Sequence, residues 1–142
     1  MDALYQKQIL ALAKAARASV PLESWTHSAT VTNPTCGDRV EIYLTIDSDQ
    51  IITKLSTSIR GCALCEAGAG LLHECLPGIA VGQIGPLRQD IAAWMSKEDA
   101  NIPENAPQAV ETFMPVRPIR NRHKCVLLSF DAAAKAVTNV TS

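Results

Sequence analysis

A thiol and a carboxylate stand two positions apart in the segment NPTCGDRV. Residues i and i+2 of an extended segment point the same way, so Cys36 and Asp38 can face one site, and Gly37 between them lets the backbone bend. Cys62 is the next cysteine along the chain. If the fold brings Cys62 alongside, the site offers two sulfur atoms and one oxygen atom, which suits a metal ion or a reactive thiol.

A tetrahedral zinc site would need a fourth ligand, and the sequence offers several. Cys65 follows Cys62 by one helical turn, and the segment NRHKCV contains His123 and Cys125. The Cys-x-x-Cys spacing of Cys62 and Cys65 is weak on its own. A metal ligand and a small buried thiol therefore remain equal interpretations of Cys65.

The last cysteine and the other two histidines are weaker candidates. Cys75 would lie thirteen residues along a helix from Cys62, about 20 Å away, so we expect a small buried core residue there. His73 is displaced along the same helix axis, and nothing places His27 near the site. For both histidines, a surface or core position is the more common role.

Two alternating segments must bring the thiols together. Apolar and polar residues alternate over 40–46 and again over 51–59, and the turn-forming residues DSDQ lie between them, which predicts a β-hairpin. In the register where the numbers of paired residues add up to 97, Cys36 lies opposite Gly61 and beside Cys62.

The segment CALCEAGAGLLHECL, after Gly61, lacks the strand period and predicts a helix that ends before Pro77. A helix that begins near Cys62 would stabilise its thiolate. The two glycines inside this helix each cost about 1 kcal/mol relative to alanine, and they would permit close packing.

Helical and strand periodicity predicts the remaining elements. We expect helices over 4–18, 86–99 and 124–137, a short strand over 25–32 and an irregular stretch over 101–122. The predicted fold class is α+β, with a small antiparallel three-stranded sheet packed against helices. We expect one domain over 1–142, with an irregular insertion at about 77–122.

The composition is that of a globular protein, with 47% hydrophobic residues, 19% charged residues and a net charge of −1. This balance does not favour binding to nucleic acid or to a membrane surface. No apolar run approaches the roughly 20 residues that span a bilayer, and MDALYQKQIL lacks the pattern of a signal peptide. Five cysteines, an odd number, argue against a disulfide framework, so we expect a cytoplasmic protein.

Several segments resemble one protein family. NPTCGDRV, RGCALCEAGAGLL and RHKCVLLSFDAAAKAV, with the opening LYQKQIL, are similar to the iron–sulfur cluster assembly proteins of the IscU type and to the N-terminal domain of NifU. The resemblance covers nearly the whole chain and implies the IscU/NifU-like fold. The long separation of Cys62 and Cys125, with Arg122 three residues before Cys125 and Lys124 directly before it, resembles the SufU branch more than the IscU type.

By that resemblance, Cys36, Asp38, Cys62 and Cys125 would bind one zinc ion. Cys36 would accept persulfide sulfur from a SufS-like cysteine desulfurase, and it would leave the zinc when a partner histidine replaces it. Arg122 would help to dock this partner. The implied role is sulfurtransferase-like and delivers sulfur to the iron–sulfur assembly machinery.

Cys65 departs from the family pattern, as does AKAARASVP, where the family has a basic Pro-Arg-Asn segment. Cys65 could be an extra metal ligand, an alternate sulfur acceptor or a resolving thiol. An alternative function is a non-enzymatic, IscU-like scaffold, in which Cys36, Cys62 and Cys125 hold a nascent [2Fe–2S] or [4Fe–4S] cluster for transfer to apo-proteins. A purely structural zinc site is a third alternative, which the ample apolar core disfavours.

Overall fold

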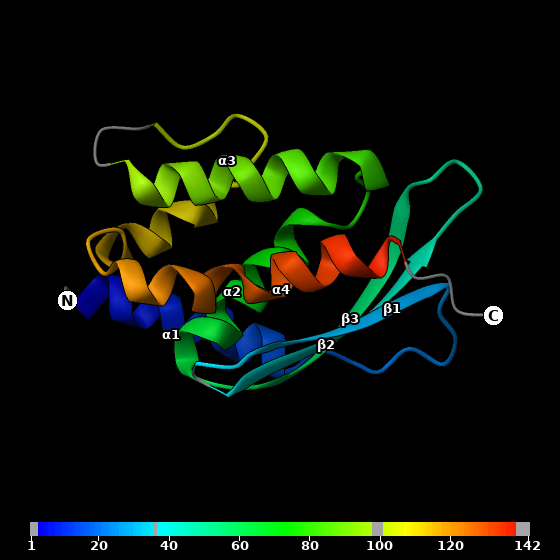
Figure 1. Cartoon of the computed structure of the whole chain (residues 1–142), viewed down its shortest axis with the longest axis horizontal. Coiled ribbons are helices and arrows are strands. Elements are labelled where there is room, and N and C mark those ends of the chain that lie inside the picture. The colour runs from blue at the N-terminus through cyan, green and yellow to red at the C-terminus, as the bar shows by residue number, and fades with distance from the viewer. Residues whose placement is uncertain (1–2, 36, 98–100, 139–142) are drawn as a thin grey trace.

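The structure, a computed structural model, describes residues 3–35, 37–97 and 101–138. Helices cover one side of a small antiparallel sheet whose strands follow the order β1-β2-β3 (Figure 1). The antiparallel sheet and the helices packed on it confirm the predicted α+β class. The elements are α1 (Ala3–Arg17), β1 (His27–Asn33), β2 (Asp38–Ile46), β3 (Ile52–Arg60), α2 (Ala63–Cys75), η1 (Val81–Gln83), α3 (Ile84–Ser96), η2 (Gln108–Val116), η3 (Arg120–Arg122) and α4 (His123–Ala136).

The alternating pattern of β2 builds the buried face of the sheet. Val40, Ile42 and Leu44 are each 0% exposed, whereas Glu41 and Tyr43 between them are half-buried. α4 packs across β1 and β2, α2 packs against both α1 and α4, and α3 packs on α4 (Figure 1). Burial of one such aliphatic side chain stabilises a fold by about 1.5–3 kcal/mol.

The predicted helices are found close to their expected positions. α3 begins at Ile84, two residues before its predicted start, and ends at Ser96, three residues before its predicted end, because Lys97 is extended. The stretch predicted as irregular contains η2, which was missed. Its apolar residues Val110, Phe113 and Val116 are buried, so a short 3-10 helix forms here because it covers the core.

The hairpin register differs from the prediction by two residues. Val40 lies opposite Ile59, where the predicted register has Thr57. Continued to the start of β2, the observed register sets Asp38, rather than Cys36, opposite Gly61. Cys36 itself lies outside the described residues. A shift of two keeps every side chain on its predicted face of the sheet.

The turn of the hairpin explains the shift. The carboxylate of Asp47 accepts hydrogen bonds from the backbone N–H groups of Asp49 at 2.9 Å and Ile51 at 3.0 Å. Ile51 therefore belongs to the turn, and it forms a bridge with Ala80 instead of pairing with β2. The ladder then resumes with an irregularity beside Ile46.

Two glycines in α2 let its neighbouring helices approach closely. A Cβ atom added at Gly68 would collide with the backbone carbonyl oxygen of Val126 in α4, and one added at Gly70 would collide with that of Leu12 in α1. No side chain fits at either contact. These glycines therefore fix where α1 and α4 lie relative to α2, which confirms their predicted role in close packing.

Candidate metal centre

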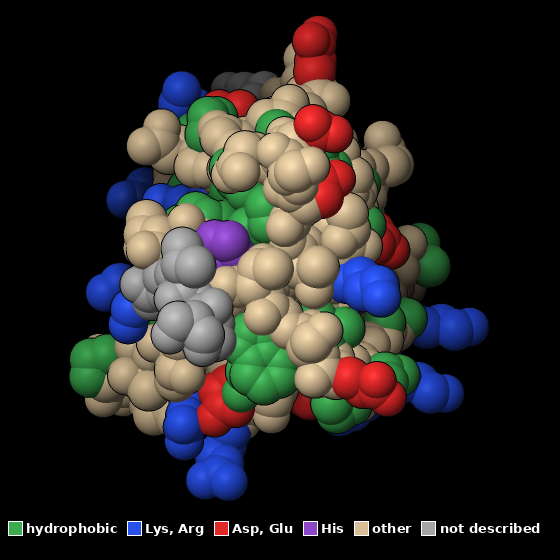
Figure 2. Space-filling view, turned by 90° about the vertical axis from the view of Figure 1, so that its right-hand side faces the viewer, with side chains coloured by type: hydrophobic (Ala, Val, Ile, Leu, Met, Phe, Trp, Pro, Cys, Tyr) green, Lys and Arg blue, Asp and Glu red, His purple; other side chains and the backbone are tan. Residues whose placement is uncertain are grey.

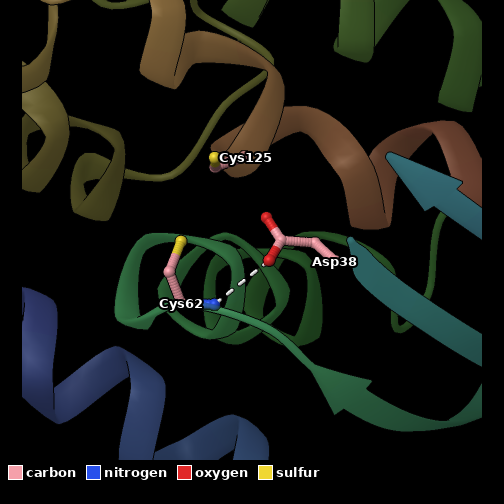
Figure 3. A group of neighbouring side chains, drawn as sticks. All are labelled: Asp38, Cys62 and Cys125. Atoms are coloured by element: carbon pink, nitrogen blue, oxygen red, sulfur yellow. Dashed lines mark hydrogen bonds between the residues drawn. The ribbon is translucent and has the colours of Figure 1, made fainter. Parts of the chain in front are cut away.

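Three side chains from three different elements meet at one end of the sheet. Asp38 is the first residue of β2, Cys62 is the N-cap of α2 and Cys125 is the third residue of α4. The two sulfur atoms and a carboxylate oxygen all lie within 4.8 Å of one another. Figure 3 shows them facing a common space, with Asp38 and Cys62 on one side and Cys125 on the other.

Asp38 is deeply buried, with 4% of its surface exposed. Its Oδ1 accepts a hydrogen bond from the backbone N–H of Cys62 at 3.3 Å, the dashed line in Figure 3. Its Oδ2 is buried and has no hydrogen-bond partner among the described residues. A buried polar atom without a partner costs about 1–3 kcal/mol, so this oxygen is suited to a ligand that is positively charged or donates a hydrogen bond.

Gly61 makes room for this carboxylate. A Cβ atom at Gly61 would lie 2.7 Å from Oδ1 of Asp38. Any other residue at this position would push the carboxylate away from Cys62. The sequence interpretation missed this role, although the Gly-Cys pair was visible in the sequence and the correct register would have placed Gly61 opposite Asp38.

A tight turn delivers Asp38 to the site. Gly37 has a φ of 73°, the left-handed region that glycine adopts most readily. Its N–H donates to the carbonyl oxygen of Asn33 at 2.7 Å, and the Asn33 side chain accepts from the N–H of Thr35 at 3.1 Å. Gly37 therefore belongs to a turn, and β2 begins only at Asp38, so the extended segment predicted around Asp38 does not include Gly37. The placement of Cys36 lies outside the described residues.

Cys65 lies in the first turn of α2 and interacts electrostatically with this group of three. It is fully buried, and burial raises the pKa of its thiol to about 12, with smaller contributions from the charges of Asp38, Cys62 and Cys125. Cys75, at the other end of α2, is also buried, and burial likewise raises the pKa of its thiol to about 12. Of these two buried cysteines, Cys65 is the one that interacts electrostatically with the candidate centre.

The histidines of the described residues have other partners. Nε2 of His123 donates to the backbone carbonyl of Arg117 at 2.9 Å. Nε2 of His73 pairs with the hydroxyl of Thr57 at 2.8 Å, and burial lowers the pKa of His73. Nδ1 of His27 lies 2.8 Å from the hydroxyl of Thr26. None of these three histidines belongs to the group of described side chains that could hold a metal ion together, which is Asp38, Cys62 and Cys125.

Arg122, the residue predicted to dock a partner, is exposed and directly precedes α4. It is the last residue of η3, three residues before Cys125.

The opposite end of the molecule, shown in Figure 2, carries acidic and basic side chains interspersed over its surface. No helix in the described part of the chain is long and apolar enough to cross a membrane.

The donor set fits a zinc ion. Ligand atoms around tetrahedral zinc sit at about 2.0–2.3 Å from the metal and therefore lie roughly 3–4 Å from one another. Two sulfurs and one carboxylate oxygen within 4.8 Å need only small movements to reach that arrangement. They supply three ligands, and a fourth would complete the tetrahedron. Thiolates with one carboxylate can equally bind an iron–sulfur cluster.

Comparisons with known proteins agree on the family and the fold. The family described as "NifU-like N terminal domain" matches residues 4–141. The N-terminal structure of a nitrogen-fixing NifU-like protein from Brucella abortus is 29% identical, with a TM-score of 0.81, over 94% of this chain and 92% of that one. A comparison with curated proteins finds no match.

Two further solved structures share the fold at lower identity. One, from Fervidobacterium islandicum AW-1, is described as a putative iron–sulfur cluster assembly scaffold protein for the SUF system. It is 21% identical, with a TM-score of 0.80, over 92% of this chain and 94% of that one. The other, described as a hypothetical protein, is 18% identical with a TM-score of 0.81, over 98% of this chain and 100% of that one.

Proposed function

The chain belongs to the NifU-like N-terminal domain family, and we propose that it works in iron–sulfur cluster assembly as a SufU-like protein. In this role it holds zinc and accepts persulfide sulfur from a SufS-like cysteine desulfurase. The sulfur then passes to the assembly machinery. The observation that carries the proposal is the meeting of Asp38, Cys62 and Cys125 in one group, with a buried carboxylate oxygen that no described residue satisfies.

Each residue has a distinct part in this proposal. Asp38, Cys62 and Cys125 hold the metal, and Cys36 is the fourth ligand and the sulfur acceptor. Zinc, when bound, keeps its cysteine ligands as thiolates. Binding therefore releases protons, and zinc affinity falls as the pH is lowered. Arg122 lies three residues before Cys125 on the exposed approach to α4, where a partner protein can contact it.

Metal analysis and a sulfur-transfer assay test the proposal. The purified chain, made without a histidine tag, should contain about one zinc ion per molecule, and Asp38→Ala should lose most of it. A SufS-like desulfurase should release sulfur from cysteine faster in the presence of the chain, and Cys36→Ala should abolish this stimulation. Cys75→Ala, which removes a buried thiol remote from the site, is the matched control. Unchanged stimulation by Cys36→Ala would exclude this mechanism.

A scaffold function is the second candidate, and the density of thiols favours it. The sulfur atoms of Cys62 and Cys125 lie within 4.8 Å of a carboxylate oxygen of Asp38, and Cys65 interacts with Asp38 electrostatically. Iron–sulfur clusters are held mainly by cysteine thiolates. Anaerobic reconstitution with iron and sulfide should then give a visible absorption band, from a [2Fe–2S] or [4Fe–4S] cluster, and the cluster should pass to an apo-protein. Asp38→Ala should slow this transfer, because a carboxylate is the weaker ligand. Loss of the cluster in that variant would contradict the labile-ligand role.

A further inference from the structure

Two cysteines, Cys62 and Cys65, belong to the first turn of α2. Cys62 is the N-cap of the helix, and the N–H of Glu66 donates to its carbonyl oxygen at 3.0 Å, so Cys65 is the third helical residue. Side chains at these two positions lie near each other. In a capping box, each of the two reaches the backbone N–H of the other residue. The Cys62 side chain makes no capping hydrogen bond. Its thiol is therefore not held by the backbone N–H groups of this turn.

The two thiols differ in access. Cys62 is half-buried, so a reagent can reach it, whereas Cys65 is fully buried. An accessible thiol followed three residues later by a buried one, at the start of a helix, is the arrangement of a dithiol couple. The first thiol receives a sulfur atom or an oxidant, and the second resolves the product.

We propose that Cys62 and Cys65 form a redox dithiol that releases sulfur from the chain as hydrogen sulfide. Cys65 gives up its proton, and its thiolate attacks the inner sulfur of a persulfide on Cys62. The bond between the two sulfurs of the persulfide breaks, and a disulfide bond forms between Cys62 and Cys65. The outer sulfur takes the electron pair and leaves as hydrosulfide, which carries the Cys65 proton away as hydrogen sulfide.

This step needs no external reductant for one turnover, because the two thiols supply both electrons. It rests on the proposed function, in that a desulfurase delivers the sulfur, which then reaches Cys62. A metal ion bound to Cys62 blocks the step. The two thiols therefore react only while Cys62 is not bound to a metal ion. A second dithiol must reduce the disulfide before the next turnover.

Cys75 provides a matched control within the same helix. It is buried like Cys65, and burial raises the pKa of both thiols to about 12. Cys75 lies ten residues further along α2, about 15 Å away, which is too far for a disulfide with Cys65. The two cysteines thus share burial and differ in their distance from Cys62.

The test treats the metal-free full chain with inorganic polysulfide, removes the excess, and measures hydrogen sulfide released without added reductant. We expect release by the wild type and by Cys75→Ala, and at least tenfold slower release by Cys65→Ala. Trypsin releases residues 61–88 as one peptide, since it cleaves after Arg60 and after Arg88. In the treated wild type this peptide should be lighter by two hydrogens, with its one remaining thiol on Cys75. Zinc added beforehand should prevent the change.

Equal release by Cys65→Ala, or a disulfide elsewhere in the chain, would overturn the proposal. The peptide analysis of the wild type gives this answer even if the variant folds poorly. The assay contains no desulfurase, so its outcome is independent of the proposed function. Failure of the desulfurase to load the chain, with normal release from polysulfide, would reject the proposed function and leave the dithiol standing.

Discussion

The middle and the N-terminal end of α2 are built in opposite ways. In the middle, Gly68 and Gly70 allow the backbones of α4 and α1 to touch the helix, among fully buried apolar residues. At the N-terminal end, Cys62 makes no side-chain capping bond, and one oxygen of Asp38 is buried without a partner among the described residues. The middle of the helix has no room for an added atom, whereas the N-terminal end has a carboxylate oxygen that accepts no hydrogen bond from the described residues.

This difference shows how the fold can support an energetically costly site. At the meeting of β2, α2 and α4, one hydrogen bond joins Asp38 to the backbone of Cys62, and the second oxygen of Asp38 is buried without a partner among the described residues, so this site is costly in the absence of a metal. Close packing in the middle of α2 sets the position of α4, and with it the position of Cys125. Stability is thus supplied next to the site, and the site itself is left with unsatisfied groups.

The largest effect should come from filling the close contact. Gly68→Ala adds a methyl group where the backbone of Val126 lies, so α2 and α4 must separate. We expect the free energy of unfolding to fall by about 3 kcal/mol, measured by urea denaturation. Gly85→Ala is the control, because a Cβ atom there meets nothing within 4 Å, and this change in α3 should raise stability by up to about 1 kcal/mol. Similar losses in both variants would contradict the comparison.

At the candidate site, we expect a substitution to raise the free energy of unfolding. Asp38→Ala removes a buried oxygen that has no partner among the described residues, at the cost of one hydrogen bond to Cys62. We expect the metal-free chain to gain about 1 kcal/mol in its free energy of unfolding, since the buried unpaired oxygen costs more than the single bond supplies. Asp90→Ala, an exposed change in α3, should have no effect. A clear loss of stability in Asp38→Ala would show that the carboxylate stabilises the metal-free fold.

Much of the fold and part of the candidate site could be predicted from the sequence. The features that could not be predicted depend on contacts that the local sequence pattern does not determine. Alternation identified the hairpin, and the meeting of β2 with the start of α2 followed from it. The register could not be fixed, because a shift of two residues leaves the alternation unchanged and only the turn after Ile46 decides it. The arrival of Cys125 depends on how α4 crosses the sheet, a tertiary contact that no local pattern encodes.

A smaller effect, visible only at acid pH, should come from the far half of α2. His73 is partly buried against Thr57, and burial lowers the pKa of His73. Its folded pKa lies below the unfolded value of 6.5, so below that pH the unfolded chain binds more protons and stability falls as the pH drops. Above pH 6.5 this contribution is fully present. His73→Gln should reduce the loss of stability between pH 7.5 and 5.5, and identical profiles would contradict the assignment.

The smallest effect should come from charge at the N-terminal end of α2. Arg17 of α1 forms an ion pair with Glu66 at 3.0 Å, and 53% of the Arg17 side chain is exposed. We expect Arg17→Ala to cost about 0.5 kcal/mol, and less in high salt, because solvent and ions screen an exposed pair. Arg39→Ala, which breaks a similarly exposed pair with Glu41, is the control. A loss well above that of the control, unchanged by salt, would mean that this ion pair, rather than the glycine contacts, holds α1 against α2.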